Sequence, residues 1–65
     1  MTFVKLTKCG PISRVTEGVT RVAVSDISRY EQPDTCYPTD VYLKSGTSFS
    51  VQESPQAIDR LIEEA

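Results

Sequence analysis

The sequence predicts a small α+β protein, with an antiparallel sheet of four or five strands and one C-terminal helix packed on one face. Three observations lead to this fold class. Short segments that alternate apolar and polar residues recur over residues 2–52, and turn residues separate them. A capped amphipathic segment follows at residues 55–64. The 65 residues predict a single domain, 1–65, because two domains need roughly 50 residues each.

Three strands are expected in the first half of the chain. Residues 2–7 alternate, residues 12–16 are rich in β-branched side chains, and residues 19–25 alternate most clearly. Residues 9–11 (Cys-Gly-Pro) and 17–18 (Glu-Gly) interrupt these segments and are interpreted as turns.

The connection that follows is expected to be irregular. Ser25 provides an N-cap for one helical turn over residues 26–29. Ile27 and Tyr30 are three residues apart, so they would share one side of that turn. Two prolines and no hydrophobic period mark residues 31–38 as a loop.

A hairpin is expected from the strands at residues 40–44 and 47–52. A two-residue turn would place the apolar residues of its two strands on opposite faces. A three-residue turn pairs Val41 with Phe49 and brings all of these apolar residues to one face. That turn needs positive φ at its third position, which Gly46 provides. The sequence therefore predicts the three-residue turn.

The helix expected at residues 55–64 starts with a strong signal. Ser54 caps it, and Pro55 suits its first position because the missing N–H has no partner there. Its apolar side chains form one stripe: Ala57, Ile58, Leu61, Ile62 and Ala65. About ten residues are too few for a helix to persist alone, so it must pack on the sheet.

Size and charge favour assembly with a second copy. Such a short chain buries about 60% of its unfolded surface, so a partner chain is the expected supplement to its core. Residues 1–30 carry five basic and two acidic side chains, whereas residues 31–65 carry two basic and seven acidic ones. This asymmetry suggests either an anionic partner for the first half or mutual attraction between the two halves, within one chain or between chains. The apolar Phe3 is expected on the outer sheet face, so Phe3, Lys5 and Thr7 are the predicted interface of a homodimer or higher oligomer.

Catalytic and metal sites are not expected. The chain contains no histidine, which excludes Ser-His-Asp and Cys-His catalysis and imidazole metal ligands. We therefore predict a non-enzyme without metal or cofactor. Cys9 and Cys36 have no CxxC spacing, and no secretion signal or membrane-length apolar run is apparent, so we expect reduced thiols in a cytoplasmic protein.

One polar surface has two interpretations. Lys5, Arg21, Tyr42 and Lys44 are expected on the sheet face away from the helix, together with several hydroxyl side chains. Such a face suits phosphates or a stacked base. It is equally typical of an ordinary solvent-exposed sheet face.

Several short segments together resemble a known family. These are ISRYE at 27–31, PDT at 33–35, VYLKSG at 41–46 and VQES at 51–54. They resemble the FlbD-like family of small flagellar proteins, although Ser45-Gly46 stands where the family has Asn-Gly, and residues 36–40 look like an insertion. The resemblance implies a small cytoplasmic motility-associated factor with no known catalytic residues.

The expected function is that of a small, non-enzymatic, cytoplasmic, homo-oligomeric protein that binds another macromolecule, as an FlbD-like motility factor or a phage or prophage accessory protein. The alternative is a module that binds nucleotides or single-stranded nucleic acid through the outer sheet face.

Overall fold

The computed structural model describes residues 2–10 and 15–65. The strand expected at residues 12–16 falls mostly outside this range, and Thr16 is the first residue of an observed strand. The described residues form five strands, one 3-10 turn and one helix: β1 (Phe3–Cys9), β2 (Thr16–Ala23), η1 (Val24–Asp26), β3 (Ile27–Glu31), β4 (Thr39–Leu43), β5 (Ser48–Val51) and α1 (Pro55–Glu64). The antiparallel sheet and the C-terminal helix confirm the predicted α+β class.

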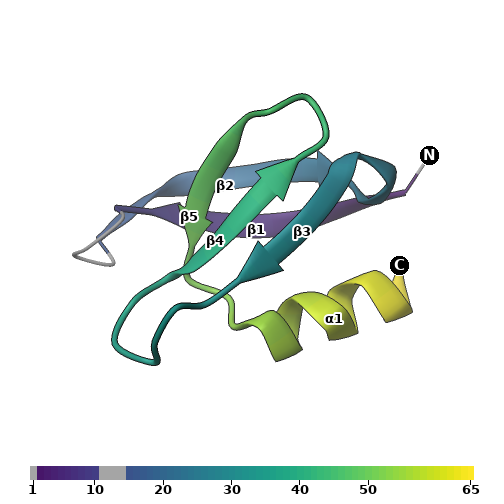
Figure 1. The fold of residues 1–65 in the computed structure, drawn as a ribbon. Coiled ribbons are helices and arrows are strands. Elements are labelled where there is room, and N and C mark those ends of the chain that lie inside the picture. The colour runs from purple at the N-terminus through teal and green to yellow at the C-terminus, as the bar shows by residue number, and fades with distance from the viewer. Residues whose placement is uncertain (1, 11–14) are drawn as a thin grey trace.

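The sheet has the order β2-β1-β5-β4-β3 and is sharply divided at its centre. β1 pairs with β2 along its whole length, but the described residues join β1 to β5 at two positions, Lys8–Val51 and Cys9–Ser50. In Figure 1 the β1–β2 hairpin passes behind β3, β4 and β5, and α1 lies beneath these strands.

β3 replaces the helical turn that was expected over residues 26–29. The prediction was wrong because a bulge mimics helical spacing. Ile27 pairs with Leu43 and the next β3 partner is Arg29, so Ser28 is an extra residue in the ladder. The bulge brings Ile27 and Tyr30 to the same face, where both pack against the core. The irregular loop therefore starts at residue 32, after Glu31.

β2 also differs from the expectation, because residues 17–18 form no turn. Cys9 pairs with Thr16 and Lys8 pairs with Gly18, so Glu17 is an extra residue in β2. Gly18 has φ of 140°, which explains why glycine occupies this position. β1 continues to Cys9, two residues beyond the predicted end, and β2 ends at Ala23, where η1 begins.

The β4–β5 hairpin has the predicted register. Val41 pairs with Phe49, and the Leu43 N–H donates to the Thr47 carbonyl at 2.9 Å. The Gly46 N–H donates to the Leu43 carbonyl at 3.0 Å, and Gly46 has φ of 97°. The apolar residues of both strands consequently lie on the core side.

Replacing Gly46 by Val is expected to lower the free energy of unfolding by about 1–2 kcal/mol, because a β-branched residue resists the left-handed conformation. A Cβ at Gly46 meets no atom within 4 Å, so backbone strain alone accounts for the loss. Urea denaturation measures it. Ser45→Ala, in the same exposed turn, should change stability by less than about 0.5 kcal/mol. Equal losses for both variants would contradict the turn assignment.

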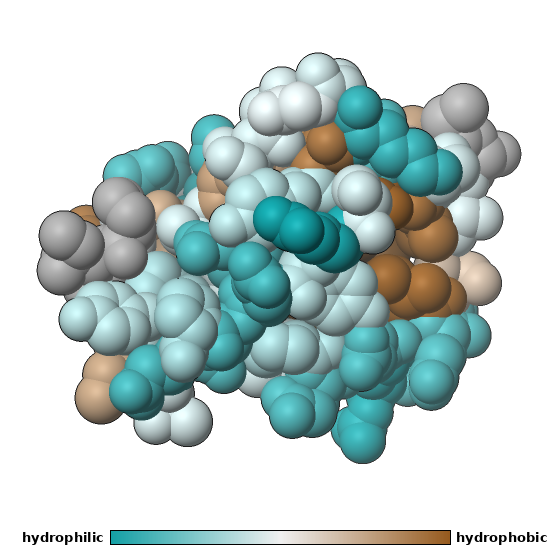
Figure 2. Space-filling model, viewed as in Figure 1, coloured by the Kyte–Doolittle hydropathy of each residue, from teal (hydrophilic) through white to brown (hydrophobic). Residues whose placement is uncertain are grey.

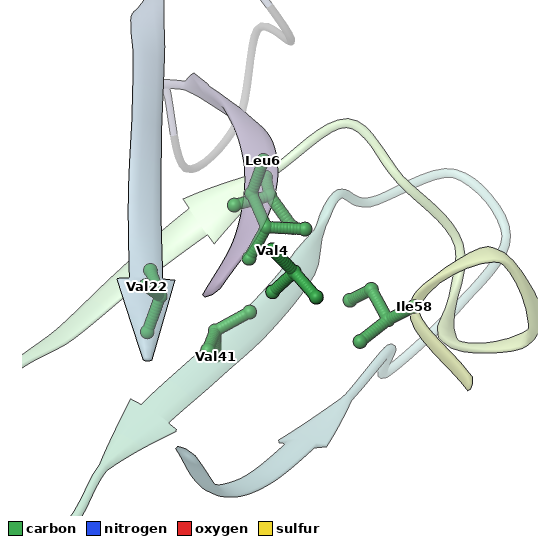
Figure 3. Close-up of a cluster of buried hydrophobic side chains, with 6 residues drawn as sticks. Val4, Leu6, Val22, Val41 and Ile58 are labelled. Atoms are coloured by element: carbon green, nitrogen blue, oxygen red, sulfur yellow. The ribbon is translucent and has the colours of Figure 1, made fainter. Parts of the chain in front are cut away.

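The core lies between the two halves of the sheet and the helix. Its buried apolar side chains are Val4, Leu6, Val22, Val41, Val51 and Ile58. Figure 3 shows Ile58 extending from α1 towards Val4 and Val41. Ile58 of the helix thus belongs to one cluster with buried residues from both halves of the sheet.

Thr39 is an exception within this interior. It is buried, and its Oγ1 has no hydrogen-bond partner among the described residues. Thr39→Val keeps the shape and removes the unsatisfied hydroxyl, so we expect the free energy of unfolding to rise by about 1 kcal/mol. Val41→Thr makes the opposite change in the same strand and should destabilise. A thermal melt of both variants checks this, and a destabilised Thr39→Val would show that the hydroxyl has a structural role.

Candidate functional site

The predicted binding residues fall into separate places. Lys5 and Arg21 pair directly across β1 and β2, and both side chains are exposed. Tyr42 is on β4, in the other half of the sheet, and Lys44 is exposed in the turn after β4. Alternation placed Lys5, Arg21 and Tyr42 away from the core correctly. Alternation did not predict the division between β1 and β5, which puts Tyr42 in a different half of the sheet from Lys5 and Arg21.

Tyr42 is accompanied by a residue that the sequence analysis missed. The Arg29 guanidinium carbon lies 4.4 Å from the centre of the Tyr42 ring, because the bulge at Ser28 makes these two residues direct partners. Ser48 is the partner of Tyr42 on the opposite side, from β5. The pairing of Arg29 with Tyr42 was not predicted because residues 26–29 were interpreted as helical.

A polar pocket of about 450 Å³ opens beside Tyr42, where β1 meets β5. One cation, Lys8, and two carboxylates, Glu17 and Asp40, line it. The Asp40 Oδ1 accepts a hydrogen bond from the Ser50 hydroxyl at 3.0 Å. The two carboxylates oppose phosphate binding at this pocket, because like charges repel.

A second, more apolar groove of about 390 Å³ runs along β2 and faces the β4–β5 hairpin. It is lined by Phe3, Lys8, Thr20, Arg21, Val22, Ala23, Asp26, Leu43, Thr47 and Phe49. Four of these are consecutive residues of β2, so the groove follows the strand's edge. The Lys8 Nζ lies 5.6 Å from the centre of the Phe49 ring. The groove therefore combines the backbone edge of a strand, an apolar wall and cations. These features together suit the binding of an extended peptide segment.

Only part of the predicted oligomer interface is exposed. Phe3 is 53% exposed and lines the groove, and Lys5 is exposed. Thr7 is half-buried, and its hydroxyl and N–H both donate to the carboxylate of Glu53. Thr7 is therefore held within the fold, although Phe3 and Lys5 remain accessible.

A hydrogen bond joins the helix to the edge strand β3. The Tyr30 hydroxyl donates to Asp59 Oδ1. This hydrogen bond, with burial and the negative charges of Asp59 and Glu63, raises the pKa of Tyr30 to about 12. Figure 2 shows apolar surface between β3 and the C-terminal half of α1, and half-buried residues of these elements include Ile27 and Ile62.

The described part of the chain contains no group of three or more His, Cys, Asp or Glu side chains placed to hold a metal ion. None of its helices has the length and apolarity needed to cross a membrane. Cys9 is buried and Cys36 exposed, and no disulfide joins these two described residues.

Comparison with known proteins found no matching family model, no matching curated protein and no matching solved structure. The resemblance to the FlbD-like family therefore stays a prediction.

Proposed function

We propose that this chain is a small, non-enzymatic, homo-oligomeric protein that binds another macromolecule in the cytoplasm, as an FlbD-like motility factor or a phage accessory protein. One observation carries the proposal: β2 is an edge strand of eight residues that borders a groove with both apolar and charged side chains in its lining. Unpaired strand edges hydrogen-bond readily to another chain, and a neighbouring groove holds that chain's side chains.

The groove also accounts for the exposed Phe3. Phe3 pairs with Ala23 at the end of β2, and both line the groove. Arg21 and Lys8 add positive charge to it, whereas Asp26 supplies one negative charge. These features favour a partner strand that carries apolar residues and at least one carboxylate.

Sedimentation equilibrium at low micromolar concentration tests the homo-oligomer. We expect at least twice the chain mass of 7.2 kDa. Val19→Lys places a charged, edge-blocking side chain at a residue that is 60% exposed, so it should reduce association without unfolding the protein. Ser45→Lys, in an exposed turn, is the matched control. A wild-type mass of 7.2 kDa throughout would overturn the homo-oligomer.

Capture of a partner from a cell lysate tests the second part of the proposal. Wild-type protein and Ser45→Lys should retain the same partner, which is then identified by mass spectrometry and confirmed with the purified partner. Retention of the same material by heat-unfolded protein would show that the capture is non-specific.

A second candidate function is supported by the contact between Arg29 and Tyr42. Tyr42 is half-buried, and a guanidinium stacked on an aromatic side chain at a sheet surface is typical of surfaces that hold unpaired bases. Fluorescence anisotropy with a labelled oligonucleotide tests this. Binding that weakens with salt and is lost in Arg29→Ala would support nucleic-acid binding, whereas no binding at low salt would exclude it.

A further inference from the structure

We propose that two copies of the chain join through their β2 edges, antiparallel about a two-fold axis at Val19. In this arrangement Val19 lies opposite Val19 of the second copy, and Glu17 lies opposite Arg21 of the second copy. The proposal rests on the homo-oligomeric part of the proposed function, and it names the surface and the register.

The choice of β2 follows from the two edges of the sheet, β2 and β3. β3 has five residues, is interrupted by the bulge at Ser28, and is fastened to α1 through Tyr30 and Asp59. β2 has eight residues, and its ladder with β1 is regular from Gly18 to Ala23. Bulges, proline, lysine and covering elements are the usual protection of an edge. From Gly18 to Ala23, β2 has none of these among the described residues, and its bulge at Glu17 lies near the start of the strand, at the end of the proposed contact.

The side chains of β2 alternate between the two faces of the sheet, and both faces contribute to the proposed contact. Val19 and Arg21 lie on the outer face, opposite Thr7 and Lys5 of β1. Glu17 lines the polar pocket with outer-face residues such as Tyr42, so its carboxylate lies on the same face. Glu17, Val19 and Arg21 thus form an outer row of negative, apolar and positive side chains.

That row selects one register. A two-fold axis perpendicular to the sheet keeps each face continuous and places a residue opposite its own copy. An axis at Arg21 would oppose two guanidinium groups. An axis at Thr20 would pair Arg21 with Val19 of the second copy and Glu17 with Ala23 of the second copy, so no charged residue would have an oppositely charged partner. An axis at Val19 gives one apolar pair and two pairs of opposite charge, which is the favourable combination for cross-strand neighbours.

The inner face fits the same register. Gly18 would lie opposite Thr20 of the second copy, and because glycine has no side chain, no clash arises there. The second strand would run along Thr20–Ala23 and cover the groove that these residues line. Val19, which is 60% exposed in the single chain, would lose this exposure.

Disulfide trapping tests the register directly. Val19→Cys is made in a Cys36→Ser background, because Cys36 is exposed and would cross-link by itself. Residues directly opposite in a ladder have Cα atoms about 4.5–5.5 Å apart, a distance that a disulfide spans. We expect a covalent dimer on mild oxidation. Thr20→Cys in the same background is the control for the neighbouring register and should stay uncross-linked.

Charge exchange supplies an independent readout. Glu17→Arg and Arg21→Glu should each weaken association about tenfold, since each creates two like-charge pairs across the axis. The double variant restores the pairs and should recover the wild-type dissociation constant. Lys44→Glu, in an exposed turn, should have no effect.

The outcomes separate the two proposals. An oligomer that cross-links equally through Thr20→Cys, or tolerates both single charge changes, would overturn the β2 register and leave the homo-oligomer standing. A wild-type protein that stays monomeric would overturn both.

Discussion

Replacing Ile58 by Asp is expected to abolish folding. Ile58 is the buried residue of α1, with no exposed surface, and it packs in the cluster that includes Val4 and Leu6. The substitution removes an apolar side chain and puts a carboxylate where the cluster offers it only apolar neighbours. Burial of an unpaired charge costs several kcal/mol, and the cavity adds about 2–5 kcal/mol. Together these losses equal the whole stability of a typical small domain, about 5 kcal/mol.

Circular dichroism during heating measures this effect. Ile58→Asp should show no cooperative transition, whereas Glu64→Ala, on the exposed side of the same helix, should melt within a few degrees of the wild type. Asp59 is unsuitable as a control because it accepts the hydrogen bond from Tyr30. Native-like melting of Ile58→Asp would show that α1 does not dock on the sheet.

Glu53→Ala is expected to lower the free energy of unfolding by about 2–3 kcal/mol, although Glu53 belongs to neither a strand nor the helix. Its carboxylate accepts from the Thr7 N–H at 2.9 Å and from the Thr7 hydroxyl at 3.0 Å. The Gln52 N–H donates to the Thr7 carbonyl at 2.9 Å. Residues 52–53 therefore extend the ladder of β1 beyond its pairs with β5, and alanine would leave the half-buried Thr7 N–H without this acceptor.

Urea denaturation of a matched set tests the role of Glu53. Gln56→Ala changes an exposed residue that lines the same pocket as Glu53, and it should cost less than about 0.5 kcal/mol. Glu53→Gln keeps one carbonyl oxygen and should fall between Glu53→Ala and the wild type. A loss for Glu53→Ala no larger than that for Gln56→Ala would mean that water replaces the carboxylate without penalty.

Local signals in the sequence were sufficient for the β4–β5 hairpin and for α1. Gly46 defined the turn, and Ser54 with Pro55 defined the helix start; the Ala57 N–H donates to the Ser54 hydroxyl at 3.1 Å. β3 was missed because a bulge and a helical turn both bring residues three apart to one side. Residues 17–18 were interpreted as a turn because a glycine with positive φ serves in bulges as well as in turns.

The candidate site was predicted less well than the fold. Alternation identifies which side chains leave the core, and it put Lys5 and Arg21 on the same sheet face. It cannot report that the described residues pair β1 with β5 at two positions, because strand pairing of this kind depends on contacts between residues far apart in the sequence. The groove along β2 was missed for the same reason: its residues come from both halves of the divided sheet.

The narrow junction between β1 and β5 has a consequence for the order of folding. Each half of the sheet is built from hairpins between neighbouring segments, and such local contacts form quickly. The bonds that unite the halves, including those from residues 52 and 53 to Thr7, span more than forty positions and close a long loop. We therefore expect the hairpins within each half to form early and docking of the segment before α1 to be the late, rate-limiting event.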